Sequence, residues 1–478
     1  MRQADQLYIN GEWTTPVDGT AQELTAPATG QVSGRIVLGG GADVDRAVRA
    51  AREAFPAFSA TPVAERIELL EAIGAEYARR AEDMAQAVTA ELGSPISLSR
   101  TLHVPAAQSQ FHHAAQALGR MDLVDRRGTT WVRREPIGVC ALITPWNYPA
   151  LQPAGKVASA LAAGCTVVLK PAQTGPYSAL LLAEILDTAG VPAGVFNLIL
   201  GRGSVVGDVL NAHPDIDMIS FTGSGPVAVG VSAAAAPTAK RVLTELGGKS
   251  PQIILPDADL DVAVGTAVLY GLGNSGQTCG AASRTLVPRD RLDEFLDALT
   301  ERIGALKVGD PQDEDTFMGP VVSAGQWDTV QGYIRQGIDA GARLVTGGPG
   351  KPDLPAALKD GHFVRPTVFA EVTNGMAIAR EEIFGPVLSV ITYDTVEEAI
   401  RIADDSPFRL CGYVTSTHPG RARAVAERMR TGYVLINDAD FDFNTSWGGY
   451  KQSGNGREWA DFGISEYLET KSIVGVTA

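Results

Sequence analysis

The stretch GVCALITPWNYPALQPAGKVASALAAGCTVVLKP, residues 138–171, decides the fold class of this chain. Two short apolar runs, 138–145 and 165–171, flank a small-residue segment, 150–164, that has the length and composition of a helix. Strands that are apolar on both faces are typical of a parallel sheet covered by helices on both sides. The stretch therefore predicts a strand, a helix and a second parallel strand.

The same alternation continues along most of the remaining chain. Further short apolar runs separated by helical segments are VFNLIL, MISFTG, PQIILP, SRTLVPR, PVLSVITYD, GYVTS and YVLIND. We expect an α/β protein with two doubly wound units that divide near residues 246–250.

Composition narrows the functional class. The chain has 478 residues, which favours two or more domains, and a net charge of −15. That charge argues against nucleic acid or an anionic membrane as a partner. No apolar run approaches the ~20 residues of a membrane span, and the beginning of the sequence lacks a signal-peptide core. We expect a cytoplasmic protein.

Four cysteines are scattered through the chain, without the spacing of a zinc site or a CxxC pair. We therefore expect free thiols and no metal. Cys140, Cys165 and Cys411 lie in apolar, strand-like runs and are expected to be buried. Cys279 differs, because NSGQTCGAASR (274–284) surrounds it with small residues that leave a thiol accessible. Both a reactive thiol and a small buried side chain fit this stretch.

Two other stretches contain candidates for chemistry. Glu245 precedes the double glycine of TELGGKSP, between an apolar helix and a strand, where a carboxylate can act as a base or remain a solvated surface group. Asn147, in TPWNYP, follows an apolar strand, where its amide can stabilise an oxyanion or simply form a turn.

Two segments suit a phosphate-containing ligand. Lys170 ends the strand of VVLKPAQTGP and can meet a phosphate or remain solvated. SFTGSGPVAVG (220–230) predicts a strand, a glycine turn and a helix start, whose free N–H groups suit a pyrophosphate. A plain tight turn fits the same residues.

Taken together and in order, these motifs resemble the NAD(P)-dependent aldehyde dehydrogenase superfamily over nearly the whole chain. The matching pieces are TPWNYP, LKPA, FTGS, ELGGKSP, GQTC, VGDP, MGPVVS, RPTVF, EEIFGPV and GGYKQSGNGRE. The resemblance implies that Cys279 attacks an aldehyde, that Asn147 holds the oxyanion, and that Glu245 activates the water that hydrolyses a thioester.

The resemblance also implies the cofactor site and two neighbouring positions. The cofactor is NAD or NADP, and the matching residues are Thr144, Trp146, Lys170, Gln173, Gly223, Ser224, Glu382 and Phe384. Lys156 and Glu458 match further family positions near the active site.

The family fold implies three parts. Residues 1–125 and 138–246 form a Rossmann-like NAD(P)-binding domain, and residues 247–445 form an α/β catalytic domain. Residues 126–137 and 446–478 form a small β bridging arm that pairs subunits into a homodimer or homotetramer. Polar, strand-like sequence in both arm segments fits this expectation.

Three residues depart from the family pattern. Gln173 stands where members that prefer NAD often have a glutamate, so use of NADP remains open. Ala228, after Pro226, replaces a glycine in the helix that follows FTGS. Trp447 replaces the phenylalanine that usually precedes the double glycine of the C-terminal motif.

Hints about the aldehyde are few. Gly155 stands where related enzymes often place a bulky aromatic residue, which predicts a wider entrance. Asp438, Asp440 and Asp442 of INDADFDF are expected near the pocket mouth and favour a cationic or polyhydroxylated aldehyde. A CoA-acylating relative and a non-catalytic relative are the alternatives, and the presence of Glu245 and Cys279 argues against them.

Overall fold

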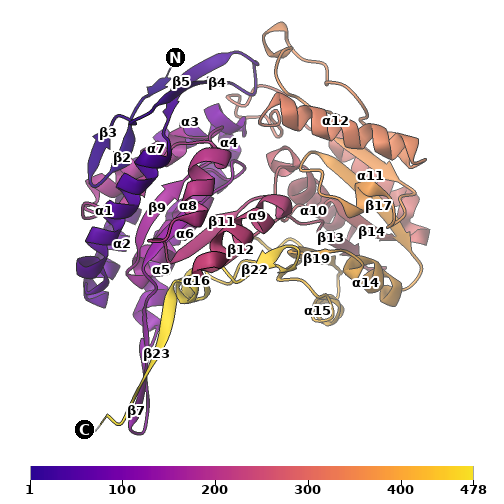
Figure 1. Cartoon of the computed structure of the whole chain (residues 1–478). Helices are drawn as coiled ribbons and strands as arrows, with labels where there is room; N and C mark the ends of the chain where they lie inside the picture. Colours follow the sequence, from indigo (N-terminus) through magenta and orange to yellow (C-terminus); the bar gives the residue numbers. More distant parts are fainter. Residues whose placement is uncertain (1, 477–478) are drawn as a thin grey trace.

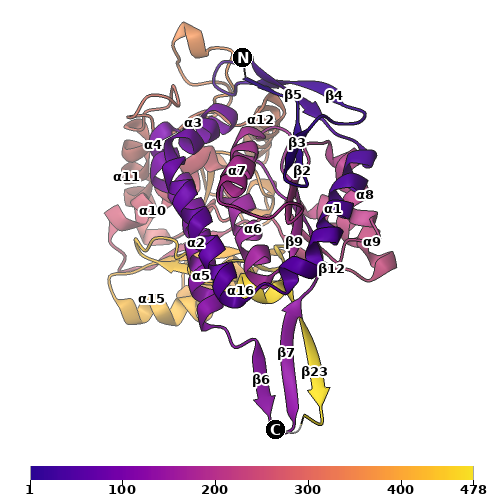
Figure 2. The same cartoon turned by 90° about the vertical axis from the view of Figure 1, so that its left-hand side faces the viewer.

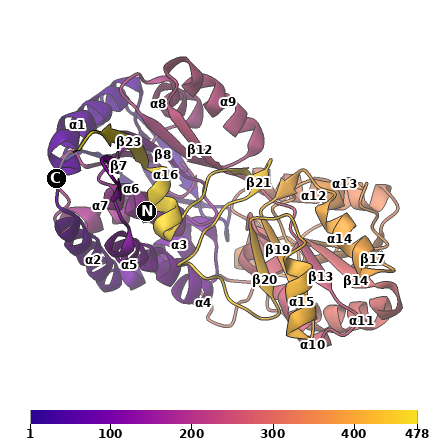
Figure 3. The same ribbon diagram turned by 90° about the horizontal axis from the view of Figure 1, so that it is seen from below.

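The computed structural model describes residues 2–476, so Met1, Thr477 and Ala478, at the ends of the expected first domain and arm, lie outside the described residues. Two lobes lie side by side, and a narrow β arm extends away from the first lobe (Figure 1, Figure 3). Each lobe is built around its own sheet. Among the described helices, none combines the length and apolar composition needed to cross a membrane.

An eight-stranded sheet forms the centre of the first lobe. In spatial order its strands are β22 (Gly454–Asn455), β12 (Arg241–Glu245), β11 (Met218–Thr222), β8 (Val139–Ile143), β9 (Thr166–Lys170), β10 (Phe196–Leu198), β2 (Leu7–Ile9) and β3 (Glu12–Thr14). The five strands from β12 to β10 are parallel. At the edges, β22 pairs antiparallel with β12, β2 pairs antiparallel with β10, and β3 pairs antiparallel with β2. Every residue of β8, β9 and β11 is buried, as their apolar runs predicted.

Helices cover both faces of this sheet (Figure 3). One face carries α6 (Leu151–Ala163), which is buried along its whole length because α2 (Val63–Arg79) and α5 (Val104–Arg120) pack over it. The other helices of the lobe are α1 (Gly41–Ser59), α3 (Ala81–Leu92), α4 (Ile96–Leu98), α7 (Tyr177–Thr188), α8 (Asp208–Ala212) and α9 (Gly225–Ala235). The predicted strand, helix and parallel strand over residues 138–171 are confirmed as β8, α6 and β9.

A seven-stranded sheet forms the second lobe. Its order is β15 (Arg343–Thr346), β16 (Thr367–Ala370), β17 (Val387–Tyr393), β14 (Arg284–Pro288), β13 (Pro251–Ile254), β19 (Cys411–Thr415) and β20 (Tyr433–Ile436), and only β15 is antiparallel among these strands. Its helices are α10 (Leu260–Leu272), α11 (Leu292–Gly304), α12 (Ala324–Asp339), α13 (Ala377–Arg380), α14 (Val396–Asp404) and α15 (Pro419–Ala426). Helices α10 and α11 share one apolar core, and α12 to α15 share another. The chain changes sheets between Glu245 and Pro251, and the α/β expectation is confirmed.

The arm is a three-stranded antiparallel sheet of β6 (Val124–Arg127), β7 (Thr130–Pro136) and β23 (Leu468–Val474) (Figure 2). Before the chain enters the arm, β22 completes the first sheet and α16 (Ala460–Glu466) packs on α5. Two smaller sheets join β1 (Arg2–Ala4), β4 (Thr20–Thr25) and β5 (Val32–Leu38), and β18 (Phe408–Arg409) with β21 (Tyr450–Lys451).

Candidate active site

Cys279 lies on the loop that follows α10, at the junction of the two lobes. Three consecutive residues of this loop, Asn274, Ser275 and Gly276, have left-handed backbone conformations, with φ of 52°, 56° and 70°. A side chain at Gly276 would lie 2.2 Å from the carbonyl oxygen of Gly385, so only glycine fits there. This turn presents a partly exposed Cys279 to a cavity, whereas Cys140, Cys165 and Cys411 are buried.

The surroundings of Cys279 disfavour its thiolate. Burial raises the pKa of the thiol well above its usual value, and the carboxylates of Glu245 and Glu382 raise this pKa further. The neutral thiol is therefore favoured over the thiolate in this environment.

Asn147 is tied to the cysteine loop. The side-chain Nδ2 of Asn147 donates to the backbone carbonyl oxygen of Gln277 at 3.0 Å. The backbone carbonyl oxygen of Asn147 accepts from Asn274 Nδ2 at 3.1 Å. The hydroxyl groups of Tyr148 and Thr278 add a contact of 2.9 Å. Because an amide nitrogen carries two hydrogens, Asn147 keeps a second N–H available for another acceptor.

Glu245 is the last residue of β12. The expectation that it follows a helix was wrong, because α9 ends at Ala235 and β12 lies between them. The carboxylate is buried, and neither oxygen has a hydrogen-bond partner within residues 2–476. Burial raises the pKa of Glu245 well above its usual value, the charge of Glu458 raises it further, and Lys156 opposes the shift.

Lys156 and Glu458 form a buried ion pair beside Glu245. Lys156 Nζ also donates to Ser220 Oγ at 2.8 Å. A buried charge needs such a partner, because an unpaired one would carry a large desolvation cost. The two residues therefore keep opposite charges close to Glu245.

Lys170, Thr144 and Gln173 lie together where β8 and β9 end. The buried Lys170 Nζ donates to the carbonyl oxygen of Pro171 at 3.2 Å, and burial lowers its pKa to about 8. The backbone N–H of Thr144 donates to the carbonyl oxygen of Lys170 at 3.1 Å, while the buried Thr144 hydroxyl has no partner among the described residues. Gln173 is half-buried in the following loop.

Gly223 and Ser224 connect β11 to α9. The N–H of Gly223 donates to the carbonyl oxygen of Glu245 at 3.1 Å. Ser224 caps α9, whose first turn contains Pro226. The side chain of Ser224 makes no capping hydrogen bond, so N–H groups of this turn remain available to a ligand. Ala228 is buried in the helix.

Glu382, Phe384 and Trp146 face the cysteine loop from both lobes. Glu382 Oε1 accepts from the Gly248 N–H at 3.0 Å, and burial raises the pKa of Glu382 to about 7. A side chain at Gly247 would lie 2.1 Å from Glu382 Oε2. The Phe384 and Trp146 rings meet edge to face at 5.3 Å.

A cavity of about 410 Å³ opens beside Cys279. Most of its wall is aromatic or aliphatic, formed by Leu98, Leu102, Tyr148, Leu151, Leu269, Tyr270, Phe441, Phe443, Trp447 and Trp459. Among the three aspartates expected at the mouth, Asp440 lines the cavity, while Asp438 and Asp442 are not part of the lining.

Gly155 does not widen this cavity. A side chain there would lie 3.4 Å from Trp459 Cδ1 and 3.5 Å from Gln110 Oε1. The expectation of a wider entrance was wrong, because the Trp459 ring occupies the space that the absent side chain leaves.

Some cavity residues escaped the sequence analysis. Leu98 ends α4, Thr101 and Leu102 lie in the π-helical turn that follows it, Ser99–His103, and Tyr270 lies on α10. A π-helical turn rotates side chains out of the ordinary helical register and is frequent at functional sites. The apolar periodicity of this segment gave no signal of it.

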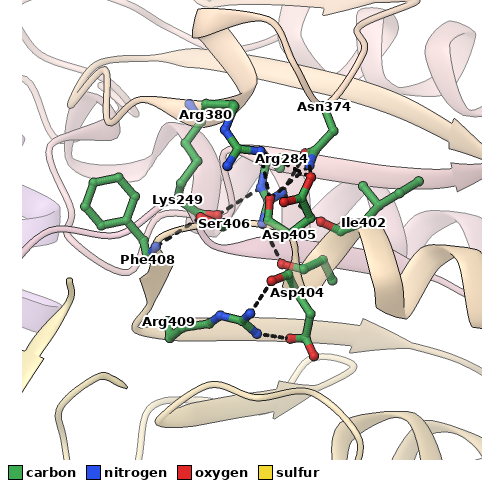
Figure 4. A network of polar contacts seen from close by, with 11 residues as sticks. Lys249, Arg284, Asn374, Arg380, Ile402, Asp404, Asp405, Ser406, Phe408 and Arg409 are labelled. Carbon is green, nitrogen blue, oxygen red and sulfur yellow. Dashed lines mark hydrogen bonds and ion pairs between the residues drawn. The ribbon is translucent and has the colours of Figure 1, made fainter. Parts of the chain in front are cut away.

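A polar network around Arg284 holds Lys249, the residue that follows Gly247 and Gly248 (Figure 4). The buried Arg284 donates from Nε to the carbonyl oxygen of Lys249 at 3.0 Å, from Nη1 to Asn374 Oδ1 at 2.9 Å, and from Nη2 to the carbonyl oxygen of Ala403 at 2.9 Å. The backbone of Lys249 is thereby held just before β13 begins. The network fixes the loop that brings Gly248 to Glu382.

Comparison with known proteins decides the family. The chain matches the sequence profile described as the aldehyde dehydrogenase family over residues 13–473. The chain belongs to the aldehyde dehydrogenase family. The expected resemblance is therefore confirmed, and with it the assignment to the oxidoreductases that act on aldehydes.

Several aldehyde dehydrogenases are similar over nearly their whole length. A 3-succinoylsemialdehyde-pyridine dehydrogenase of Pseudomonas sp is 50% identical, with 99% of each chain covered. A mutant of aldehyde dehydrogenase C from Pseudomonas syringae, complexed with NAD+ and octanal, is 47% identical with a TM-score of 0.97, covering 99% of this chain and 97% of the other. An NAD+ complex of a Mycobacterium tuberculosis aldehyde dehydrogenase is 41% identical with a TM-score of 0.95, covering 99% and 98%.

Proposed function

We propose that this aldehyde dehydrogenase oxidises an aldehyde to the carboxylic acid with NAD(P)+ and releases the free acid. The observation that carries the proposal is the arrangement around one cavity. Cys279 lines the cavity, and the Asn147 side chain hydrogen-bonds to the loop that contains Cys279. The buried Glu245 is close enough to raise the pKa of the Cys279 thiol. This arrangement supports the roles of nucleophile, amide donor and base that we propose for the three residues.

The chemistry takes place on Cys279. The Cys279 thiol gives its proton to solvent and its sulfur attacks the aldehyde carbon, which forms a thiohemiacetal. The second N–H of Asn147 and the backbone N–H of Cys279 stabilise the oxyanion. A bound NAD(P)+ would supply the hydride acceptor, and the oxidised carbon would then be held as a thioester on the Cys279 sulfur. Glu245 then takes a proton from water, whose oxygen attacks the thioester and displaces the Cys279 sulfur.

The residues fit a dinucleotide. The α9 turn at Gly223 and Ser224 offers N–H groups to a pyrophosphate, and Lys170 offers a buried ammonium group. Glu382 and Phe384 would hold the nicotinamide ribose and ring, while Thr144 and Trp146 would contact the adenosine side. NAD+ is the cofactor we propose, supported by its presence in similar structures. The neutral Gln173 also admits NADP+, because it does not repel a 2′-phosphate.

The proposal also assigns a separate function to each part of the chain. Residues 1–125 and 138–246 bind the cofactor, and residues 247–445 supply the nucleophile. Residues 126–137 and 446–478 pair subunits into a homodimer or homotetramer, supported by the exposed strand edges of the arm. The free thiols support a location in the reducing cytoplasm.

The cavity wall favours an aldehyde with an aromatic or extended apolar body. This replaces the expectation of a cationic or polyhydroxylated aldehyde, since Asp440 alone of the three aspartates lines a wall that is mostly apolar. The similar enzymes named for a pyridine semialdehyde and complexed with octanal support the same class. Release of the free acid, rather than acyl transfer to CoA, is supported by the buried carboxylate of Glu245.

Initial rates of reduced nicotinamide formation at 340 nm test the proposal. The panel compares benzaldehyde and octanal with acetaldehyde, betaine aldehyde and succinic semialdehyde, each with NAD+ and with NADP+. Each buried methylene contributes ~0.8 kcal/mol, so we expect kcat/KM to rise about fourfold per added carbon along the linear series. A higher kcat/KM for acetaldehyde than for octanal would contradict the substrate class. Cys279→Ala should abolish every rate, and activity that survives in it would contradict the nucleophile.

A further inference from the structure

Trp447 is carried to Glu245 by the returning C-terminal segment. Gly454 pairs with Glu245 in the antiparallel contact of β22 with β12. Trp447 pairs with Glu458, with hydrogen bonds of 3.0 Å from the Trp447 N–H and 2.7 Å from the Glu458 N–H. The same short segment therefore brings both the Lys156-bound Glu458 and the Trp447 indole beside the carboxylate.

The neighbouring rings fix the orientation of Trp447. Trp459 stacks on it at 5.1 Å between ring centroids with an interplanar angle of 20°, and Phe441 meets it edge to face at 5.6 Å. Trp447 Cη2 and Cζ2 lie 3.1 and 3.9 Å from the position of a side chain at Gly280. Nε1 lies on the Cζ2 side of an indole, so its N–H is on the ring edge that faces the cysteine loop.

The donor and the acceptor are both buried and unpartnered. Trp447 is 4% exposed and Glu245 is 2% exposed. Trp447 Nε1 and both carboxylate oxygens of Glu245 lack a direct hydrogen bond to any of residues 2–476. Buried donors and acceptors are nearly always satisfied, since an unmade hydrogen bond is costly. A small shift of the carboxylate side chain, or one bridging water, satisfies both groups at once.

We propose that Trp447 is a positioning residue whose indole N–H donates to the Glu245 carboxylate, directly or through one water, and holds it ready to activate the hydrolytic water. This rests on the proposed role of Glu245 as the base of thioester hydrolysis. The phenylalanine that is usual at this position in the family has no such donor.

The charges around Glu245 explain why a neutral donor is useful there. Burial and the charge of Glu458 raise the pKa of Glu245, whereas Lys156, Arg457 and the nearby indole N–H of Trp447 lower it. Lys156 is already committed to Glu458. The indole favours the ionised carboxylate without adding another charge next to Cys279.

The test is the pH dependence of thioester hydrolysis in Trp447→Phe. Stopped-flow measurement of reduced nicotinamide separates the initial burst, which reports acylation and hydride transfer, from the steady rate, and an acylating ester substrate isolates deacylation. Removing the donor raises the pKa of Glu245, so more of the base is protonated at a given pH. We expect the acidic limb of the deacylation profile to move up by about one pH unit, while the burst remains.

Trp459→Phe is the matched control, because it alters the same cavity wall by the same substitution while keeping an aromatic ring to stack on Trp447. We expect it to change the KM for aldehyde without moving the acidic limb. Glu245→Gln should retain the burst and lose the steady rate, and adding Trp447→Phe to it should lower that residual rate no further. The proposal is overturned if the acidic limb of the deacylation profile does not move in Trp447→Phe, or if it moves by the same amount in Trp459→Phe. Failure of the unmodified enzyme to form any reduced nicotinamide with the aldehydes would instead contradict the proposed function.

Indole N–H resonances of the unmodified enzyme give a second measurement that needs no stable Trp447 variant. The chain has six tryptophans, so six ¹⁵N-labelled indole signals are expected. One of them should titrate with pH in the unmodified enzyme and stop titrating in Glu245→Gln. A set of signals that responds to pH identically in both proteins overturns the proposal.

Discussion

Gly247→Ala is expected to weaken cofactor binding by displacing Glu382. The added side chain would lie 2.1 Å from Glu382 Oε2, whereas ordinary contact begins near 3.4 Å. The carboxylate must therefore move by more than 1 Å, and it loses the 3.0 Å hydrogen bond from the Gly248 N–H. Hydrogen bonds to a charged group contribute ~1.5–3 kcal/mol.

If Glu382 holds the nicotinamide ribose, that loss corresponds to about 10- to 150-fold in the apparent KM for NAD+. The backbone of Gly247 is outside the left-handed region, so alanine adds little strain, and the clash is with the mobile end of a side chain. We therefore expect the melting temperature to fall by only a few degrees, about what 1 kcal/mol produces in a large domain.

The assay is the KM for NAD+ at saturating aldehyde, together with the dissociation constant of NAD+ from protein fluorescence. Gly230→Ala is the control, because Gly230 is exposed in α9 and nothing lies near its missing side chain. Its KM for NAD+ should be unchanged, and its stability should rise slightly through better helix propensity. An unchanged NAD+ affinity in Gly247→Ala would refute the placement of Glu382 against the cofactor.

Two other substitutions test the roles of Asn147 and Glu245 beside Cys279 individually. Asn147→Ala should lower kcat by about 10²- to 10³-fold through the loss of one oxyanion donor, and an effect confined to KM would contradict that role. Glu245→Gln removes a negative charge that raises the pKa of the Cys279 thiol. The pH profile of iodoacetamide alkylation should therefore move to lower pH in this variant, and a shift to higher pH would contradict the electrostatic assignment.

Most of the fold follows from apolar runs whose strands are buried on both faces. β8, β9 and β11 are examples, because every residue in them is apolar, small or uncharged except the terminal Lys170. β12 escaped detection because Arg241 and Glu245 bracket only three inner residues. Its pairing with β11 and β22, rather than its own composition, makes it a strand.

The candidate site could be predicted where a local motif carries it, as at Cys279 and Asn147. The cavity wall could not, because it depends on packing between distant segments. Gly155 is an example, because its lack of a side chain suggests an open space in the sequence. In the structure Trp459, which lies more than 300 residues later in the chain, fills that space. The orientation of Trp459 depends on a left-handed backbone, with φ of 70°, that tryptophan rarely adopts.

The pairing of β22 with β12 has a consequence for biosynthesis. Thr244 and Asn455, which bond to each other across this pairing, are separated by 211 residues. During translation, the edge of β12 that later pairs with β22 therefore stays unpaired until the whole second lobe has emerged from the ribosome. Such long-range pairing forms slowly and leaves an edge that can recruit other chains. A polypeptide that terminates before Gly454 would lack both the covering strand and the Trp447 pairing with Glu458, so the nascent chain becomes an enzyme only near the end of its synthesis.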